Sequence, residues 1–389
     1  MAGAYILSSV RTPVGRAFKG GLRATRPDEM AATALRAALV RAGVEGREIE
    51  DVILGCAMPE AEQGLNVARI AALRAELPDE VSAVTVNRFC ASGLEAIAIA
   101  SQRVEAGGAE AILAGGTESM SMVPIVGNKP SANPWLMDHR PEAYLSMGLT
   151  AERVAKACAI GREEADAFAL ESHRKAIAAQ DAGRFTDEIE PVTTRVPDGD
   201  GGWREQVIRQ DEGPRRDTSA AALAALAPVF HTHGSVTAGN SSQASDGAAA
   251  AVIASERFVQ ARKLAPRARL ASYATVGTDP ALMGLGPVGA IPKALRRAGV
   301  KLEEIDVIEL NEAFAAQALA VIREAHLDAG RVNVNGGAIA LGHPLGCTGA
   351  KLLATLLAEL ERRRARWGLI TMCVGGGQGA AAVVESLWR

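Results

Sequence analysis

An internal duplication constrains the fold of this chain more than any other feature of its sequence. Residues 38–55 read ALVRAGVEGREIEDVILG, and residues 294–311 read ALRRAGVKLEEIDVIELN. Each stretch has the pattern of an amphipathic helix, a glycine turn and an apolar strand. The sequence therefore predicts two copies of one structural unit, placed far apart along the chain.

The similarity continues downstream of both stretches. Residues 84–116 read as a strand, a helix and a second strand that ends in glycines, and residues 332–377 show the same order. The two helices are expected to begin near Ala91 and near Thr348. Parallel strands need a crossover connection, usually a helix, so the repeat predicts an α/β fold with two sheets of parallel type.

The segment between the two copies has a different composition. Prolines, tryptophans and histidines appear within residues 119–248, and residues 197–219 read as loop and turn. A chain of 389 residues with 48% hydrophobic side chains can bury two or three structural units. We therefore predict an N-terminal half (1–118 plus 249–268), an inserted loop domain (119–248) and a C-terminal half (269–389).

Charge and hydropathy argue against several classes of protein. The net charge of −3 at pH 7 gives no general attraction to nucleic acid or to an anionic membrane surface. No apolar run reaches the roughly 18 to 20 residues that a membrane span needs. The first residues lack a signal-peptide pattern, and AYILSSV reads instead as a first strand. We expect a cytoplasmic protein without nucleic-acid partners or a membrane span.

Cys90 is the first candidate for chemistry. It follows the apolar segment AVTVNRF and opens CASGLEAIAIAS, which predicts a sharp strand-to-helix turn with the sulfur near the helix N-terminus. Unpaired N–H groups at a helix N-terminus stabilise a thiolate and lower the thiol pKa, which favours a nucleophile. The alternative is a small buried hydrophobic side chain, which free cysteine often is.

His343 is the second candidate. It lies in NGGAIALGHPLGCTGAK, a glycine-rich loop that leads into the helix of the second copy. The duplication places it close to the element of Cys90 across a pseudo-twofold relation. A neutral imidazole there could take the thiol proton and later polarise a bound thioester carbonyl. The alternative is a loop histidine tied to the backbone.

Cys373 ends the strand-like segment WGLITM and precedes VGGGQGAAAVVES. Glycines after a cysteine let the backbone approach a ligand closely and present N–H groups to an oxyanion. Residues 375–380 also fit the G-x-G-x-x-A dinucleotide pattern. Too few residues follow for the rest of a βαβ unit or its ribose-binding acid, so we interpret this match as a false lead.

Asn311 stands where an apolar strand is expected to give way to a helix, with Glu312 in the first turn. Its amide could position a water toward the same carbonyl as His343. The alternative is a helix N-cap, a position that asparagine favours, and the two roles are compatible.

The five cysteines are Cys56, Cys90, Cys158, Cys347 and Cys373. An odd number without a CxxC pair argues against a disulfide framework and a structural zinc site, so we expect reduced thiols and no bound metal. Cys56 and Cys158 lack a polar, glycine-rich setting and are assigned to structure. Cys347 occupies the helix-start position that matches Cys90 in the second copy, and we regard it as a weaker candidate for chemistry.

Seven segments together resemble the thiolase family across essentially the whole chain: NRFCASGLEAI, GGTESMSM, MGLTAE, VTAGNSSQASDGAAA, NEAFAAQ, NGGAIALGHPLGCTGA and CVGGGQG. The resemblance implies two halves of the thiolase fold, each with a five-stranded mixed sheet, stacked as α-β-α-β-α layers. It implies that the loop domain covers coenzyme A (CoA), which is a substrate, with no tightly bound cofactor. It also implies a homodimer or a dimer of dimers.

The resemblance assigns roles to the candidate residues. Cys90 attacks the keto carbon of a 3-ketoacyl-CoA, or the thioester of an acyl-CoA in the reverse direction, and becomes acylated. His343 activates Cys90, and Cys373 moves the proton at the α-carbon of the acetyl-CoA unit. One oxyanion hole would use His343 with a water held by Asn311. The other would use the backbone N–H groups of Cys90 and Gly375.

The resemblance also places residues along the CoA. Ser242 would lie against the pantetheine arm. Phe230, Ala238 and Phe314 would line the tunnel, and Met147 would lie near the acyl end. Arg215 and Arg216 are candidate partners of the CoA phosphates because planar guanidinium groups bind phosphate bidentately. The alternative for both arginines is simple solvation in a loop.

The subtype is indicated by two departures from the biosynthetic pattern. Short-chain biosynthetic thiolases are expected to have a histidine before the MG of the loop and GNASGLNDGAA at the CoA strand. This chain has Ser146 before Met147 and GNSSQASDGAA, which resembles the degradative 3-ketoacyl-CoA type of fatty-acid or similar side-chain β-oxidation. Loss of the histidine enlarges the acyl pocket and favours medium or longer chains. The alternative is a biosynthetic acetoacetyl-CoA thiolase.

Three rival interpretations remain to be weighed. A decarboxylating ketoacyl synthase pairs its nucleophilic cysteine with two histidines or with a histidine and an asparagine, and Cys373 argues against it. A catalytically silent CoA-binding scaffold would lack Cys90, His343 or Cys373, and all three are present. A thiol-redox protein would need cysteines close in sequence or a thioredoxin-like motif, and the chain has neither.

Overall fold

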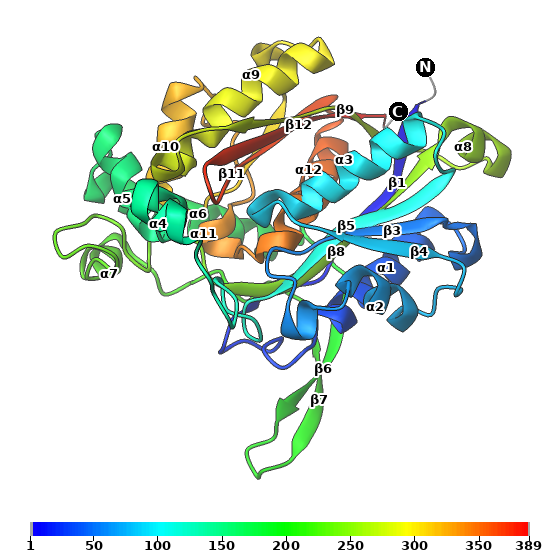
Figure 1. Ribbon diagram of the computed structural model, residues 1–389, viewed down its shortest axis with the longest axis horizontal. Helices are drawn as coiled ribbons and strands as arrows, with labels where there is room; N and C mark the ends of the chain where they lie inside the picture. The colour runs from blue at the N-terminus through cyan, green and yellow to red at the C-terminus, as the bar shows by residue number, and fades with distance from the viewer. Residues whose placement is uncertain (1–2, 388–389) are drawn as a thin grey trace.

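The computed structural model describes residues 3–387 of the chain (Figure 1). Its strands are β1 Ala4–Arg11, β2 Gly15–Arg16, β3 Asp51–Gly55, β4 Ser82–Val86, β5 Ala111–Ser119, β6 Val192–Pro197, β7 Trp203–Ile208, β8 Ser245–Ser255, β9 Ala268–Gly277, β10 Val307–Leu310, β11 Trp367–Val374 and β12 Gln378–Ser386. Its α-helices are α1 Pro27–Ala42, α2 Val67–Arg74, α3 Ser92–Glu105, α4 Pro134–His139, α5 Met147–Ala157, α6 Arg162–Asp181, α7 Ala220–Ala224, α8 Glu256–Arg262, α9 Gly286–Ala298, α10 Ala315–Glu324, α11 Ala338–Leu341 and α12 Leu345–Arg363.

The strand order confirms the duplication. In the N-terminal half, neighbouring strands run β3, β5, β8, β1, and in the C-terminal half they run β10, β11, β12, β9. In each set the first pair is parallel and the next two pairs are antiparallel. The similar stretches found in the sequence are thus topologically equivalent, and α3 corresponds to α12.

The expectation of two separate five-stranded sheets needs a correction. The two sets join edge to edge where Ile6 of β1 pairs with Ala268 of β9. β4 extends the N-terminal set, but its counterpart in the second copy is only an isolated bridge between Val332 and Ile308. Asn333 explains the difference, because its φ of +45° interrupts an extended strand. Its side-chain amide instead bonds the backbone of Leu310: Oδ1 accepts from Leu310 N at 2.9 Å, and Nδ2 donates to Leu310 O at 2.8 Å.

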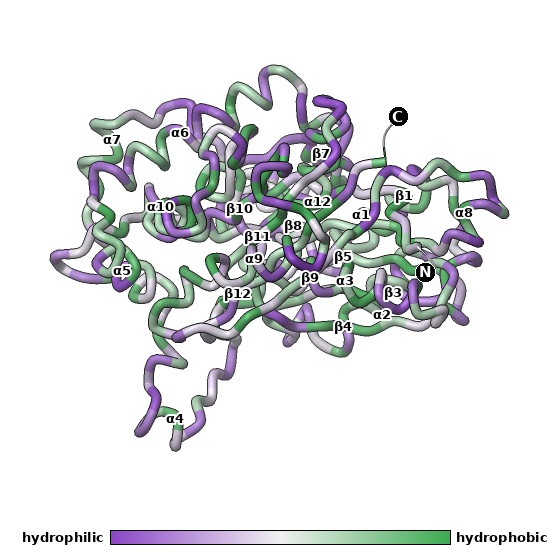
Figure 2. The backbone as a smooth tube through the Cα atoms, turned by 90° about the horizontal axis from the view of Figure 1, so that it is seen from above, coloured by the Kyte–Doolittle hydropathy of each residue, from purple (hydrophilic) through white to green (hydrophobic). Residues whose placement is uncertain are grey.

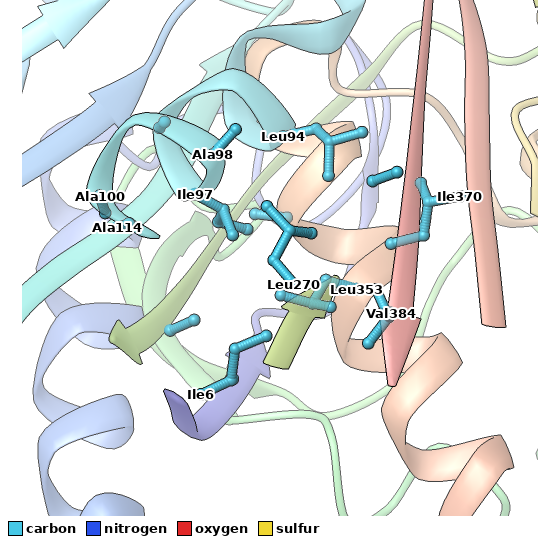
Figure 3. Packing of buried hydrophobic residues seen from close by; sticks show 14 of the residues in the cluster. Ile6, Leu94, Ile97, Ala98, Ala100, Ala114, Leu270, Leu353, Ile370 and Val384 are labelled. Carbon is cyan, nitrogen blue, oxygen red and sulfur yellow. The ribbon is translucent and has the colours of Figure 1, made fainter. Parts of the chain in front are cut away.

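The predicted α-β-α-β-α layers are confirmed. α3 and α12 lie between the two sets of strands, and Leu94, Ile97, Leu353, Ile370 and Val384 pack together in this central layer (Figure 3). α1 and α2 cover the outer face of the N-terminal strands. α9 and α10 cover the outer face of the C-terminal strands. Burial of these apolar faces stabilises the fold at roughly 25 cal/mol per Å² of apolar surface removed from water.

The two central helices touch where each begins. A Cβ atom on Gly93 would lie 2.7 Å from the carbonyl oxygen of Gly346, and one on Gly349 would lie 2.6 Å from Cβ of Leu94. Only glycine permits helices to approach this closely, which accounts for the glycines in both helix-start motifs. α12 begins at Leu345, three residues before the expected start, so Cys347 and Thr348 lie in its first turn.

The segment between the halves contains more regular structure than its sequence suggested. It carries α4 to α7 and the hairpin β6–β7, which projects from the body of the molecule (Figure 1). The expectation that residues 197–219 are entirely loop is wrong, because Trp203–Ile208 pairs with Val192–Pro197 across a turn that contains Gly199 and Gly201. Figure 2 shows the part around α4 extending away from the rest of the chain.

None of the helices within the described part of the chain is both long and apolar enough to cross a membrane.

Candidate active site

Cys90 lies in a tight turn between β4 and α3. A single 3-10 turn, Phe89–Ala91, carries it, and α3 follows directly. Phe89 has a φ of +44°, which is strained for a residue with a side chain. Ser92 holds the turn: its Oγ accepts from Arg88 N at 2.8 Å and donates to Phe89 O at 2.7 Å. The sharp strand-to-helix turn predicted from the sequence is thus confirmed.

The thiol of Cys90 faces the other half of the molecule. Burial raises its pKa to about 11, although the N–H groups of Gly375 and of Cys90 itself favour the thiolate and oppose this rise. The expectation that the helix N-terminus lowers this pKa is therefore wrong. Removal from water outweighs the N–H groups when no substrate is present. Cys90 is a neutral thiol at pH 7 and must lose its proton to a partner.

Cys373 and Gly375 come from the hairpin of β11 and β12. Cys373 is buried in β11, opposite Gly379, and its pKa is raised by burial and by the neighbouring Cys90 thiol. Gly377 has a φ of +85°, and a Cβ there would lie 2.5 Å from the carbonyl oxygen of Thr278. The glycine-rich turn therefore brings backbone N–H groups of the C-terminal half to the sulfur of Cys90.

His343 is buried, and its tautomer is fixed by Thr348. The Thr348 hydroxyl donates its one hydrogen to Pro344 O at 2.8 Å. The His343 Nδ1 atom lies 2.6 Å from the same hydroxyl oxygen, so Nδ1 must be the donor of that contact. The proton of the neutral ring therefore sits on Nδ1, and Nε2 presents a lone pair.

The surroundings keep the His343 ring neutral. Burial and the cationic Lys351 lower its pKa to about 3. Asn311 Nδ2 lies 3.3 Å from Nε2 and can donate to it, which agrees with the Nδ1–H tautomer. The ring is thus neutral rather than cationic at pH 7.

Asn311 follows β10 but does not begin a helix. The N-cap of α10 is Phe314, so neither the expected N-cap role of Asn311 nor the first-turn position of Glu312 holds. Asn311 N instead donates to Thr371 O at 3.0 Å, which extends the parallel pairing of β10 and β11. Its side-chain Oδ1 is buried and accepts no hydrogen bond from the described residues.

The two groups of candidate residues meet where the halves of the fold touch. Gly93 and Gly346 are in contact, and they follow Cys90 and His343, respectively, by three residues. Asn311 sits beside β11, the strand that carries Cys373. The site therefore lies at the starts of α3 and α12 and at the carboxyl ends of β10 and β11.

Glu118 anchors this junction and was not identified from the sequence. Its buried carboxylate accepts hydrogen bonds from Ala57 N and Gly346 N, both at 2.8 Å, and from the Gln63 amide at 2.7 Å. It also lies 3.8 Å from the Cys56 thiol, so the expectation that Cys56 lacks a polar setting is wrong. Glu118 belongs to the segment GGTESMSM, but nothing in that pattern indicates that it accepts from α12.

Most of the expected CoA-lining residues gather beside Cys373. Phe314 and Met147 pack in one apolar cluster with Cys373, and the Phe230 ring meets the Phe314 ring edge to face at 6.2 Å. Ser242 N donates to Ala313 O at 2.9 Å, which places Ser242 beside Phe314. These side chains form an apolar wall that reaches the candidate catalytic thiol.

A separate cavity of about 280 Å³ lies beside the segment that carries Ser242. Its lining includes Ala238 and Gln243, which flank the segment of Ser242, and Arg215. Arg216 is not part of that lining: it is exposed and forms an ion pair with Asp181. Of the two candidate phosphate-binding arginines, the structure therefore brings only Arg215 to the cavity.

His173 is a second residue that the sequence did not indicate. It is buried in the wall of the same cavity, and its Nδ1 accepts from Arg215 N at 3.1 Å. Burial and the cationic Arg215 lower its pKa to about 4, so the ring is neutral at pH 7. With Nδ1 as acceptor, the ring proton lies on Nε2.

The remaining cysteines lie outside the constellation. Cys347 is buried in the central layer, and burial raises its pKa to about 12. Cys158 is half-buried and packs beside α10. Within residues 3–387, no three His, Cys, Asp or Glu side chains come together in the manner of a metal site.

Comparisons with known proteins agree with this geometry. Family models described as "Thiolase, N-terminal domain" and "Thiolase, C-terminal domain" match residues 4–257 and 264–386. The chain is 50% identical over 389 residues to the 3-ketoacyl-CoA thiolase of Bacillus subtilis (strain 168), which covers 99% of this chain and 100% of the relative. It is 46% identical over 393 residues to the acetyl-CoA acetyltransferase of Shinella zoogloeoides, covering 98% of each. The crystal structure of the Bacillus anthracis acetyl-CoA acetyltransferase matches with a TM-score of 0.91 at 41% identity, covering 100% of this chain and 99% of that one.

Proposed function

Because this chain belongs to the thiolase family and is an acyltransferase, we propose that it cleaves 3-ketoacyl-CoA thiolytically through an acyl intermediate on Cys90. The products are acetyl-CoA and an acyl-CoA whose chain is shorter by the acetyl unit. One observation carries the proposal: the turn that carries Cys90 packs against β11, the strand of Cys373, and against Gly375.

The first half-reaction begins with proton transfer from Cys90 to Nε2 of His343. The sulfur then adds to the keto carbon of the substrate, and the bond between that carbon and the α-carbon breaks. The electron pair passes to the α-carbon, which takes the proton of Cys373. The raised pKa of Cys373 suits this role because the thiol still carries its proton at neutral pH.

The second half-reaction transfers the acyl group to CoA. The thiolate of Cys373 takes the proton of the incoming CoA thiol, and the CoA sulfur attacks the acyl carbon on Cys90. Cleavage of the acyl–sulfur bond releases acyl-CoA. Cys90 then recovers its proton from His343, which returns the site to its starting state.

Two sets of donors would stabilise the oxyanions of these steps. After His343 has taken the Cys90 proton, its Nε2–H becomes a donor, and Asn311 Oδ1 is free to hold a water beside it. The N–H groups of Cys90 and Gly375 form the other set. Loss of one such donor typically costs about 10²- to 10³-fold in kcat.

CoA would lie along the apolar wall and the cavity described above. Ser242 would lie against the pantetheine arm, Phe230, Ala238 and Phe314 would line the tunnel, and Met147 would lie near the acyl end. The lining of the cavity offers Arg215 to the CoA phosphates. No tightly bound cofactor enters the reaction, because every group that moves belongs to the two substrates or to the three side chains.

Ser146 supports a degradative role. It precedes Met147 at the acyl end, and a serine there leaves more room for an acyl chain than a histidine would. We propose that medium or longer 3-ketoacyl-CoA esters of β-oxidation are the substrates.

We also propose the division of the chain into an N-terminal half (1–118 plus 249–268), a loop domain (119–248) and a C-terminal half (269–389). In this proposal the loop domain covers the CoA.

We also propose that the enzyme works in the cytoplasm as a homodimer or a dimer of dimers. Two catalytic thiols require a reducing compartment. β4 pairs with β3 on one edge, and no other strand of the described chain covers its second edge, which carries the exposed Val84. Light scattering coupled to size-exclusion chromatography tests the assembly: a monomer at micromolar concentration would contradict it.

The function is tested with a panel of 3-ketoacyl-CoA esters of increasing chain length plus CoA. Loss of the enolate absorbance reports cleavage. We expect higher kcat/KM on medium and longer esters than on acetoacetyl-CoA, and no cleavage by Cys90→Ala. A clear preference for acetoacetyl-CoA would favour the biosynthetic alternative, and unchanged activity of Cys90→Ala would remove the nucleophile.

A further inference from the structure

The turn of Cys90 and the hairpin of Gly375 belong to opposite halves of the fold, and side chains join them. Arg88, two residues before Cys90, donates from Nη1 to Oε1 of Gln378 at 2.9 Å. Gln378 is the first residue after the three glycines of the hairpin and pairs with Val374. The contact therefore bridges the two backbone segments whose N–H groups meet at the Cys90 sulfur.

Arg88 is itself held in a defined orientation. Its guanidinium contacts the carboxylate of Glu95 through two nitrogens, and the Tyr273 hydroxyl bonds the same carboxylate. Glu95 lies in the first turn of α3, and Tyr273 lies in β9 of the C-terminal half. A guanidinium fixed by a bidentate carboxylate presents its remaining donor in one direction, here toward Gln378.

Both bridged segments need external support. Phe89 has a strained φ of +44°, and such conformations persist only where the surroundings over-determine them. Gly375, Gly376 and Gly377 carry no side chains, and glycine has the largest conformational freedom of any residue. The glycines themselves offer no side chain to tie this loop, whereas the flanking Gln378 ties it to Arg88.

We propose that the Arg88–Gln378 hydrogen bond positions the N–H of Gly375 relative to the N–H of Cys90, so that both donors point at one oxyanion. Arg88 and Gln378 are positioning residues and touch no substrate. The inference rests on the proposed function in one respect: the oxyanion is that of the acyl transfer on Cys90. A misplacement of about 1 Å at a reacting centre can cost about 10²-fold in rate.

The test uses variants that replace either partner of the hydrogen bond with an unbranched side chain that can neither donate to nor accept from the other. For Gln378→Met and Arg88→Met, we expect kcat for thiolysis to fall about 10- to 100-fold, with KM for both substrates within about twofold. The double variant should be no slower than the slower single variant, because each single change already removes the Arg88–Gln378 hydrogen bond. Gln378→Glu retains an acceptor for Arg88 and should keep kcat within about threefold of the wild type.

Arg267→Met is the matched control. Arg267 forms a bidentate pair with Glu361 at 2.6 and 2.7 Å, away from the candidate residues, and its loss should leave kcat within about twofold. Equal losses in Arg267→Met and Gln378→Met would indicate general destabilisation and overturn the proposal. Additive losses in the double variant, or wild-type kcat in both single variants, would also overturn it.

Hydrogen exchange separates failure of this inference from failure of the proposed function. We expect the amides of residues 375–378 to exchange at least about tenfold faster in Gln378→Met than in the wild type. This measurement does not depend on any substrate. A wild-type enzyme that cleaves no 3-ketoacyl-CoA would refute the function, whereas unchanged exchange in Gln378→Met would refute the positioning role.

Discussion

The hydroxyl of Thr348 determines which nitrogen of His343 carries the proton. The two groups lie 2.6 Å apart, and Thr348 gives its own hydrogen to Pro344 O. The lone pair of the neutral ring is therefore on Nε2, the atom that we propose receives the Cys90 proton. Thr348 is buried in the first turn of α12, so this arrangement is shielded from water.

Thr348→Val removes the acceptor of the Nδ1 proton and frees the ring to change tautomer. We expect kcat to fall about 10- to 100-fold with little change in KM, because the loss affects proton transfer rather than binding. Steady-state kinetics with a 3-ketoacyl-CoA checks this. Thr348→Ser keeps the hydroxyl and should retain most of the activity, and a Thr348→Val enzyme with wild-type kcat would show that the tautomer is set elsewhere.

The raised pKa of Cys90 predicts how the free enzyme reacts with alkylating agents. Only the thiolate reacts, and its fraction rises about tenfold per pH unit below the pKa. Since that pKa is about 11, the rate of inactivation by iodoacetamide should climb steadily from pH 7 to pH 10. A plateau below pH 8 would mean that Cys90 and His343 already form an ion pair in the absence of substrate.

Glu118 is predicted to support stability more than any exposed carboxylate. Glu118→Ala leaves buried donors on Ala57, Gly346 and Gln63 without their acceptor. We expect the free energy of unfolding to fall by about 3–5 kcal/mol, measured by urea titration. Glu171, whose side chain is 45% exposed and paired with Arg174, provides the control. If Glu171→Ala destabilised the protein as much, the anchoring role of Glu118 would be refuted.

Arg215 and Arg216 are adjacent in sequence but are predicted to differ in function. Arg215 lines the cavity, whereas Arg216 is paired with Asp181 at the surface. Arg215→Met should raise the KM for CoA about 3- to 10-fold at unchanged kcat, because a charge-assisted contact to phosphate is lost. Arg216→Met should leave the KM for CoA within about twofold. Equal effects of the two substitutions would contradict the CoA path proposed here.

The sequence predicted the parts of this molecule that depend on local pattern and on repetition. The duplication predicted the equivalence of β3 with β10 and of α3 with α12, and the apolar segment WGLITM predicted the strand that ends near Cys373. These features follow from periodicity and from turn chemistry, which neighbouring residues encode. The layered arrangement came from the family resemblance and is confirmed.

What the sequence did not predict depends on partners that are distant along the chain. Glu118 accepts a hydrogen bond from Gly346 that exists only once α12 has packed against the N-terminal half. The pKa of Cys90 was expected to fall, because a helix start is visible in the sequence whereas the extent of burial is not. The alternative role of Asn311 as a helix N-cap does not hold, because α10 begins four residues later.

The central claim is that Cys90 carries the acyl group while Cys373 acts only on the carbon–carbon bond. The direct measurement is peptide mass spectrometry after brief incubation with acyl-CoA, applied to the wild type and to the Cys373→Ser and Cys90→Ala variants. We expect one acyl adduct on the Cys90 peptide in the wild type and in Cys373→Ser, which fails in thiolysis, and none in Cys90→Ala. An adduct on Cys373, or acylation that survives Cys90→Ala, would contradict the account.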